Sequence, residues 1–179
     1  MYRRINLFGG PGSGKSTTAA KLFSELKLLR KSGKIRQNVE LVTEVVKPWA
    51  YAGQTPVGWD QLHLFSEQLR REELYLRNGV DIVITDSPLL LNWVYSDQAK
   101  LSFTSEIYNM VWQFEEKYPS LNYFIKREGD YVNNGRFQTL DDSKNLDKII
   151  YKTIKGWAQS VESNDSILES ILEHLPSVK

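Results

Sequence analysis

A glycine-rich segment near the N-terminus constrains the fold more than any other part of the chain. From Gly9 to Thr17 it reads GGPGSGKST. An apolar run at residues 3–8 precedes it, and a stretch with apolar residues at helical spacing, residues 15–31, follows it. A strand, a glycine turn and a helix in this order predict the first unit of a parallel α/β sheet.

The spacing inside this segment, a glycine, four residues and then Gly-Lys-Ser, is typical of a loop that binds phosphate at a helix N-terminus. In such a loop backbone N–H groups converge on phosphate oxygens, the Lys15 ammonium neutralises the β- and γ-phosphates, and the Ser16 hydroxyl binds Mg²⁺. We therefore expect ATP and Mg²⁺ as ligands. The residues expected to bind the nucleotide are Gly10, Gly12, Ser13, Gly14, Lys15, Ser16 and Thr17. The alternative, a chance glycine-rich turn, leaves the flanking strand and helix unexplained.

The rest of the chain alternates between strand and helix patterns. Further strands are predicted at residues 39–44, 80–85 and 121–125, with a weaker one at residues 159–162. Helices are predicted at residues 60–77, 89–95, 105–117, 141–157 and 166–175. This alternation predicts one three-layer α/β/α domain over residues 1–179, with a five-stranded parallel sheet and ligands at the carboxyl ends of the strands. A glycine- and asparagine-rich segment, about residues 127–140, is predicted to form a lid.

Composition limits the kinds of ligand and partner. The chain has no cysteine and two histidines, so a metal ion would be held by oxygen ligands. The formal net charge of +1 provides no overall field toward nucleic acid, which mildly favours a small-molecule partner. No apolar run reaches the ~20 residues that cross a bilayer, and the N-terminus lacks the pattern of a signal peptide. We therefore expect a cytoplasmic protein with no membrane partner.

A carboxylate ends the third predicted strand. Asp86 follows the apolar run of residues 80–85 and would hold Mg²⁺ directly or through water. The alternative is that Asp86 caps the helix that begins after Pro88. No acidic residue follows Asp86, whereas motor-type ATPases commonly have one there to activate water. The segment therefore favours a kinase, in which water is excluded from the transferred group.

Glu44 stands at the end of the second predicted strand. It would lie in the crevice next to the predicted phosphate loop. Its carboxylate is a candidate base that accepts the proton of an attacking hydroxyl, or a ligand of the acceptor. A structural ion pair with Lys47 or Arg70 is the alternative, and the sequence leaves both open.

Basic residues flank or lie within the predicted lid. Arg127 and Arg136 are candidates to contact the transferred phosphoryl group, because guanidinium groups bind phosphate oxygens in pairs. Lys126 is the weaker candidate, and exposure on a solvated loop is the alternative for all three. The expected catalytic residues are thus Lys15, Glu44, Asp86, Arg127 and Arg136, and the expected metal ligands are Ser16 and Asp86.

Several aromatic side chains and one amide side chain follow Glu44 in the sequence and could line the same crevice. The aromatic ones are Trp49, Tyr51, Trp59 and Phe65. Their faces could stack on a flat base and the Gln68 amide could bind its edge, although each alone also fits core packing. The candidate acceptor-binding residues are Glu44, Trp49 and Gln68.

Together these segments resemble the P-loop nucleoside and nucleotide kinases, in particular small phage and bacterial kinases related to ribosylnicotinamide and deoxynucleoside kinases. The resemblance covers nearly the whole chain. It is carried by GGPGSGKST at residues 9–17, LVTE at residues 41–44, IVITDSPLLL at residues 82–91 and GRFQTLDDSKNLD at residues 135–147. It implies ATP-dependent transfer of the γ-phosphoryl group to a nucleoside, a nucleotide or a related acceptor that carries a nucleobase.

The resemblance also implies roles for single residues. Glu44 stands where deoxynucleoside kinases have their base, and Gln68 is similar to the glutamine that reads the nucleobase in those enzymes. Asp86 matches the acidic residue after their third strand, but the sequence DSP lacks the arginine that this family has there. Arg136 in the lid would then supply the missing guanidinium.

Two other functions stay open on the sequence. Certain phages use kinases of this build on hydroxymethylated pyrimidines in DNA, so DNA is an alternative acceptor, against which the near-neutral charge argues. The other is a nucleotide-dependent regulatory ATPase with no acceptor, against which the missing acid after Asp86 argues. If a phage encodes the chain, the expected compartment is the host cytoplasm.

Overall fold

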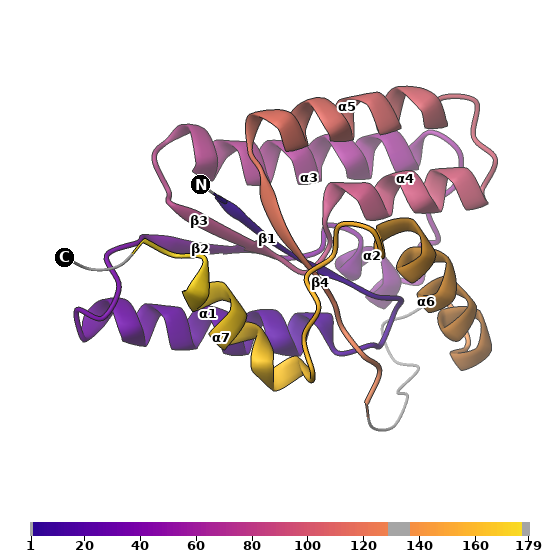
Figure 1. Ribbon diagram of the computed structural model, residues 1–179. Helices are drawn as coiled ribbons and strands as arrows, with labels where there is room; N and C mark the ends of the chain where they lie inside the picture. The colour runs from indigo at the N-terminus through magenta and orange to yellow at the C-terminus, as the bar shows by residue number, and fades with distance from the viewer. Residues whose placement is uncertain (1, 129–136, 177–179) are drawn as a thin grey trace.

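The fold is built on a parallel sheet, which has four strands in the described part of the chain. The computed structural model describes residues 2–128 and 137–176 (Figure 1). The strands are β1 (Arg4–Phe8), β2 (Val39–Val42), β3 (Ile82–Thr85) and β4 (Ser120–Phe124). Their order in the sheet is β2-β3-β1-β4, and every pairing is parallel. The predicted α/β class with a parallel sheet is confirmed.

The fifth strand predicted at residues 159–162 is wrong in extent, because only one bridge of it exists among the described residues. This parallel bridge joins Gln159 to Tyr123 of β4. Beyond it Val161 is the one apolar residue before the 3₁₀ helix at Asn164–Ser166, and it packs against the core. A single apolar side chain does not supply the alternating pattern that holds a strand on a sheet edge.

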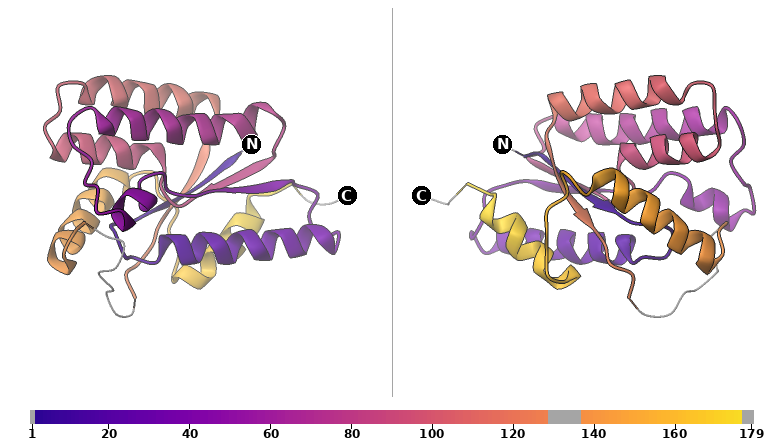
Figure 2. Two further views of the ribbon diagram at one scale, coloured as in Figure 1. Left: turned by 180° about the vertical axis from the view of Figure 1, so that it is seen from behind. Right: turned by 45° about the vertical axis from the view of Figure 1, so that its right-hand side comes forward.

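Helices cover both faces of the sheet and complete a three-layer fold. They are α1 (Lys15–Lys31), α2 (Lys47–Tyr51), α3 (Asp60–Arg77), α4 (Leu89–Gln98), α5 (Thr104–Lys117), α6 (Leu140–Ile154) and α7 (Ile167–Glu173). Helices α3, α4 and α5 lie on one face, and α1 and α7 lie on the other (Figures 1 and 2). Helices α2 and α6 lie toward the carboxyl end of the sheet. Over the described residues, none of these helices has the length and apolar character needed to cross a membrane.

Each face of the sheet packs into its own apolar core. Ile82 and Ile84 of β3 belong to the core that includes Leu26 of α1 and Ile171 of α7. Val83, between them, belongs to the core formed with α3, α4 and α5. All four residues of β3 are buried, as a strand covered on both faces of a parallel sheet requires.

The strand register brings the chemically important segments to one edge of the sheet. Phe8, the last residue of β1, pairs with Phe124 of β4, and Val42 of β2 pairs with Thr85 of β3. The segments after these strands therefore start near one another at the carboxyl edge, where open α/β sheets bind their ligands. They carry the phosphate loop, Glu44, Asp86 and Arg127.

Candidate active site

The glycine-rich segment connects β1 to α1, as the sequence predicted. Helix α1 begins at Lys15, and Gly14 before it has a φ of 100°, a left-handed value that favours glycine. Lys15 Nζ donates hydrogen bonds to the carbonyl oxygens of Gly9 at 2.7 Å and Gly10 at 3.0 Å. The ammonium therefore lies over its own loop at the helix N-terminus, where backbone N–H groups favour a phosphate.

Two glycines of the loop are required by close contacts. A Cβ on Gly9 would lie 2.5 Å from Ser13 Oγ, and the Gly9 φ of 147° is itself unfavourable for other residues. A Cβ on Gly10 would lie 2.7 Å from the Ser143 carbonyl oxygen and 2.8 Å from Asp147 Oδ1. Since Ser143 and Asp147 belong to α6, the absence of a side chain at Gly10 is what lets this helix approach the phosphate loop.

Asp147 joins three segments around this loop. Its Oδ1 accepts the Gly10 backbone N–H at 2.6 Å, and its Oδ2 lies 2.8 Å from both Nε and Nη2 of Arg127. Arg127 Nη1 also donates to the Pro11 carbonyl at 3.0 Å. The N–H of Gly10, which we expected to face phosphate, is therefore engaged by Asp147, and the Arg127 guanidinium is held beside the loop.

Charged groups surround the Lys15 ammonium. Burial lowers its pKa, the carboxylates of Glu44, Asp86 and Asp147 raise it, and Arg127 lowers it further. These groups come from elements far apart in the sequence, so the fold gathers four of the five predicted catalytic residues around one point. A bound triphosphate would add negative charge there and favour the protonated ammonium.

Asp86 follows β3 with one carboxylate oxygen free. Its side chain is buried, and Oδ1 accepts no hydrogen bond from any residue that the structure describes. The next helix, α4, has Pro88 as its N-cap and no side-chain capping bond, so Asp86 does not cap it. A buried oxygen without a partner keeps its full desolvation cost, which a cation would offset. The carboxylate therefore fits a metal ligand.

The oxygen ligands near the loop suit Mg²⁺ better than a metal bound by protein groups alone. Ser16 stands at the start of α1 and lines the same cavity as Lys15. Within residues 2–128 and 137–176, acidic and histidine side chains nowhere form a group of three or more that could hold a metal ion. Mg²⁺ binds through one or two protein oxygens and takes its other ligands from phosphates and water. Ser16 and Asp86 match that requirement.

Glu44 lies just beyond the end of β2 and lines the cavity beside Lys15. Burial raises the pKa of its carboxyl group, and the nearby Lys15 and Lys47 lower it. The alternative partner Arg70 is engaged elsewhere, since it pairs with Glu67 at 2.9 Å. Glu44 is thus placed in the crevice as a base or acceptor ligand requires, and its role stays a prediction.

One cavity of about 400 Å³ extends from the phosphate loop into the crevice beyond it. Its loop end is lined by Pro11, Gly12, Gly14, Lys15, Ser16 and Thr17. Its other end is lined by residues from the segments after β2 and β3 and from α3 and α4, namely Glu44, Gln61, Gln68, Ser87, Asn92 and Tyr95. The volume lies within the range of small-molecule sites, roughly 300–1,000 Å³.

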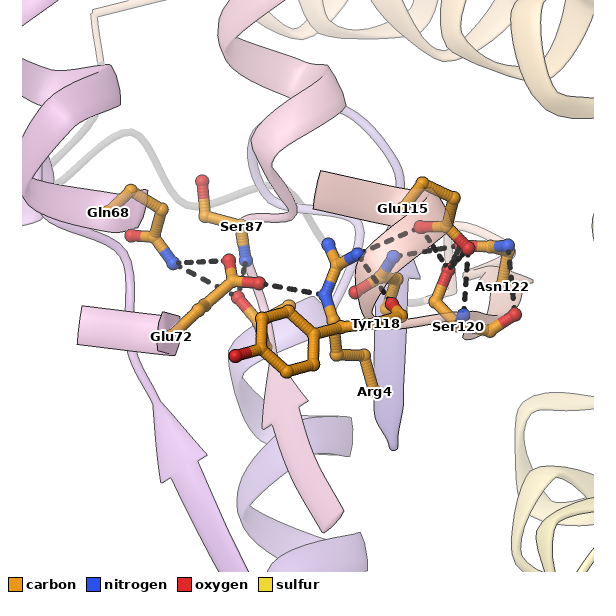
Figure 3. Close-up of polar contacts among 10 residues, drawn as sticks. Arg4, Gln68, Glu72, Ser87, Glu115, Tyr118, Ser120 and Asn122 are labelled. Carbon is orange, nitrogen blue, oxygen red and sulfur yellow. Dashed lines mark hydrogen bonds and ion pairs between the residues drawn. The ribbon is translucent and has the colours of Figure 1, made fainter. Parts of the chain in front are cut away.

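Gln68 lines this cavity and is fixed by buried polar partners (Figure 3). Its Nε2 donates to Glu72 Oε1 and to Thr85 Oγ1, each at 3.2 Å. Glu72 in turn accepts from Arg4 Nε at 3.1 Å, and Arg4 pairs with Glu115 at 2.8 Å. Burial raises the pKa of Glu72, while Arg4 lowers it. A chain of polar contacts thus runs from the sheet interior to the cavity wall.

The aromatic residues lie in different environments. Trp49 stacks on His63 with 6.1 Å between ring centroids, and in the described chain it is not part of the cavity wall. Tyr51, from the same short helix, does line the cavity. Trp59 is 69% exposed on the surface, and Phe65 is buried in the core. The structure therefore brings Tyr51, rather than Trp49, to the cavity wall.

The predicted lid is described only at its two ends, and Arg136 lies outside the described residues. At the first end, the Lys126 ammonium bonds to the carbonyl oxygens of Val161 and Glu162. At the second end, Phe137 and Gln138 line the cavity. Of the two basic residues that follow β4, Arg127 therefore lies at the phosphate loop and Lys126 is tied elsewhere.

Several cavity residues carried little or no sequence signal. Asn92 and Tyr95 lie on α4, and Asn92 Oδ1 accepts from Gln61 Nε2 at 3.0 Å. Burial raises the pKa of Tyr95, so its hydroxyl stays protonated and can donate to a ligand. Their spacing of three residues on a helix directly after Asp86 is the one pattern that could have indicated a shared face. Asp147 gave no such signal, because its partner Arg127 is on another element.

These features are those of a P-loop protein. A strand leads into a glycine loop, the lysine of the loop lies over the N-terminus of the next helix, and the loop lies at the carboxyl edge of a parallel sheet. Such a domain binds a nucleoside triphosphate, typically with Mg²⁺. Residues 4–163 match the model of the family described as AAA domain, and the chain belongs to this family. Among curated proteins no match is found. One solved structure, the crystal structure of APE1195, is similar over 97% of this chain and 96% of that chain, with 20% identity and a TM-score of 0.48.

Proposed function

We propose that the protein is a kinase that transfers the γ-phosphoryl group of ATP to a hydroxyl or phosphate group of a nucleobase-containing acceptor, such as a nucleoside or nucleotide. One observation carries the proposal: the cavity at the phosphate loop continues into a second compartment walled by α3, α4 and the segment after β2. The phosphate groups would bind at the loop, so an acceptor could occupy the part of the cavity that these other elements line. An acceptor bound there would lie beside the end of the triphosphate.

At the donor end, the chain's own groups bind and orient the triphosphate. The Lys15 ammonium, which now bonds to two loop carbonyls, would exchange these neutral partners for charged phosphate oxygens. Ser16 and Asp86 would hold Mg²⁺, which neutralises charge on the phosphoryl oxygens. Arg127, fixed by Asp147 and Pro11, would keep the loop in shape and add positive potential near the phosphates.

At the acceptor end, Glu44 would accept the proton of the acceptor hydroxyl. An acceptor hydroxyl oxygen would form a bond to the γ-phosphorus while the bond from that phosphorus to the β–γ bridging oxygen breaks. ADP leaves with the electron pair of the broken bond, and the hydroxyl proton passes to the Glu44 carboxylate. Burial raises the pKa of Glu44, which makes its carboxylate a stronger base than an exposed one.

A kinase must exclude water from the transferred phosphoryl group, whereas an ATPase must activate water to attack it. Ser87, rather than an acidic residue, follows Asp86, so the position from which motor-type ATPases activate water holds no carboxylate. The buried groups around Lys15 would exclude solvent once both compartments are filled. A regulatory ATPase therefore stays the weaker candidate.

A second acceptor class is favoured by the surface near the cavity. Tyr51, which lines the cavity, is 63% exposed, and Trp59 at the start of α3 is 69% exposed. Exposed aromatic faces stack with the bases of single-stranded nucleic acid. A base within DNA, including a hydroxymethylated pyrimidine, is thus the second candidate acceptor, with its neighbouring bases on Tyr51 and on the face of Trp59 that does not stack on Phe103.

The test is transfer of radiolabelled γ-phosphate from ATP to a panel of free nucleosides, nucleoside monophosphates, ribosylnicotinamide and DNA that carries hydroxymethylated pyrimidines. We expect label on a free nucleobase-containing acceptor. Label on DNA alone, with a yield that falls steeply as salt rises, would select the second candidate. Label that appears only as inorganic phosphate would contradict the kinase proposal.

A further inference from the structure

A second, much smaller cavity lies between β1 and α5. Its volume is about 10 Å³, and it shares no lining residue with the cavity at the phosphate loop. Arg4 and Asn6 line it from β1, and Trp112 and Glu115 line it from α5. The other residues on its wall are apolar and belong to, or pack against, the core formed with α3, α4 and α5, namely Phe8, Leu90, Val111 and Trp157. The cavity is thus a polar space inside an apolar core.

Two residues on this wall each have a buried polar atom without a hydrogen-bond partner. Within the part of the chain that the structure describes, Asn6 Oδ1 accepts no hydrogen bond and Trp112 Nε1 donates none. Asn6 as a whole is 2% exposed, so solvent at the surface does not satisfy its oxygen. A buried donor or acceptor left unpaired keeps the cost of its desolvation, and native structures nearly always satisfy it, with ordered water where no protein group is at hand.

The neighbouring strand fixes the direction of the Asn6 amide. Asn6 stands opposite Asn122 in the pairing of β1 with β4, and its Nδ2 donates to Asn122 Oδ1 at 2.9 Å. Asn122 Nδ2 in turn donates to the Ser120 backbone carbonyl at 3.4 Å (Figure 3). A turned Asn122 would set its own carbonyl oxygen against that of Ser120, so Asn122 Oδ1 faces Asn6. The nitrogen of the Asn6 amide therefore faces Asn122, and its oxygen lies on the other side of the amide.

The chemistry of the two unpartnered atoms selects the ligand. The ligand must accept a hydrogen bond from an indole N–H and donate one to an amide carbonyl, and a water molecule does both with one oxygen. A metal cation or an ammonium ion cannot accept the N–H, and a halide ion cannot donate to the carbonyl. A single water needs roughly 10–15 Å³ of such space, so the cavity holds one water and nothing larger.

We propose that this cavity binds one internal water molecule, which accepts the indole N–H of Trp112 and donates to Asn6 Oδ1. Glu115 also lines the cavity, and its carboxylate, which pairs with Arg4 at 2.8 Å, can accept the second hydrogen of the water. The water joins α5 to β1, the strand that enters the phosphate loop. No nucleotide or acceptor takes part in this site, so it does not depend on the proposed function.

A crystal structure of the full chain, at a resolution that shows ordered water, tests the proposal directly. We expect density for one water within about 3.2 Å of both Trp112 Nε1 and Asn6 Oδ1. A cavity without density, or a direct contact of these two atoms with protein groups instead, would overturn the proposal.

Two tryptophan variants test the hydrogen bond to the indole. Trp112→Phe removes the donor and should remove the water density. Trp93→Phe is the matched control, because the Trp93 ring contacts Tyr108 as the Trp112 ring does but does not line the cavity. Water that stays in place in Trp112→Phe would show that the indole N–H does not hold it.

Two solution measurements test the same site without crystals. In ¹⁵N-edited NOE and ROE spectra, the indole proton of Trp112 should show a cross-peak to water with the sign of a long-lived contact, and the absence of this cross-peak would overturn the proposal. Val111→Ile adds a methyl group at the cavity wall. It should displace the water and lower the melting temperature, because Asn6 Oδ1 and Trp112 Nε1 then lose their partner. A higher melting temperature would mean that the methyl group fills a dry cavity.

Discussion

The carboxylate of Asp147 accepts the backbone N–H of Gly10 at 2.6 Å. This hydrogen bond joins α6 to the phosphate loop across most of the chain. Because the same carboxylate pairs with Arg127, one side chain ties the loop, the segment after β4 and α6 together. The shape of the phosphate site therefore depends on a helix that the loop motif itself does not include.

Replacing Asp147 should weaken nucleotide binding. Asp147→Ala removes the acceptor of the Gly10 N–H and the carboxylate that pairs with Arg127, and the loss of a buried partner costs about 1–3 kcal/mol. Asp147→Asn keeps an oxygen for Gly10 and loses the charge, so it should lie between alanine and the unaltered protein. Titration with a fluorescent ATP analogue and urea unfolding would measure both effects. Asp141→Asn, an exposed change on the same helix, is the control, and equal affinities for all these proteins would contradict the role of Asp147.

Gly10→Ala should disturb the site through sterics alone. The added Cβ would lie 2.7 Å from the Ser143 carbonyl oxygen and 2.8 Å from Asp147 Oδ1, so α6 or the loop must shift. We expect lower thermal stability and weaker nucleotide binding. Gly156→Ala is the matched control, since its Cβ would meet nothing within 4 Å. If Gly10→Ala melts and binds like Gly156→Ala, the close approach of α6 is not required.

Lys15→Ala should abolish productive triphosphate binding. The ammonium is the group that would neutralise the phosphates, and loss of one such group commonly costs a factor of roughly 10²–10³ in turnover. Lys31→Ala, at the exposed end of the same helix, should leave turnover unchanged. Turnover in a coupled ADP-release assay reports both. Full activity in Lys15→Ala would remove the assignment of the phosphate site.

Glu44→Gln tests whether Glu44 acts as the catalytic base or has only a structural role. As a lost general base it should lower turnover by a factor of roughly 10²–10⁴ while nucleotide binding persists. In the unaltered protein, activity should rise with pH as Glu44 ionises, and the variant should lack this acidic limb. Unaltered turnover with the best acceptor would show that Glu44 is not the base.

The raised pKa of Glu44 also makes a stability prediction. Burial favours the neutral carboxyl in the folded state, so its stabilising contribution is complete below the pKa of the unfolded chain. That contribution is lost as the pH rises through the raised folded pKa. The free energy of unfolding of the unaltered protein relative to Glu44→Gln should therefore fall over this interval in urea titrations at successive pH values. A pH-independent difference would mean that the Glu44 pKa is not raised.

Local patterns predicted most of the fold. Helices α1 and α3 have the predicted bounds of residues 15–31 and 60–77, because apolar spacing and glycine stops are written into single segments. The predicted strand at residues 159–162 failed because one apolar side chain and one backbone bond do not make a strand. Extended edges depend on pairing with the rest of the sheet, which a local pattern does not contain.

Gln68 of α3 was predicted and lines the cavity, but most of the correctly predicted residues of the candidate site follow strand ends. Lys15, Glu44 and Asp86 lie at the carboxyl edge of the sheet, as a parallel topology requires. Asp147 was missed because its contact with Gly10 spans 137 positions of sequence and comes from helix packing. Trp49 and Tyr51 were not separable, because which face of a five-residue helix meets the cavity depends on its tertiary contacts.

The most direct test of the account is the stoichiometry of a single reaction. ATP and the best acceptor of the panel would be incubated with the protein, and ADP, phosphorylated acceptor and inorganic phosphate would be quantified together by ³¹P NMR. The account predicts one phosphorylated acceptor for each ADP, and loss of both products in Lys15→Ala. ADP matched by inorganic phosphate, with no phosphorylated acceptor, would contradict it.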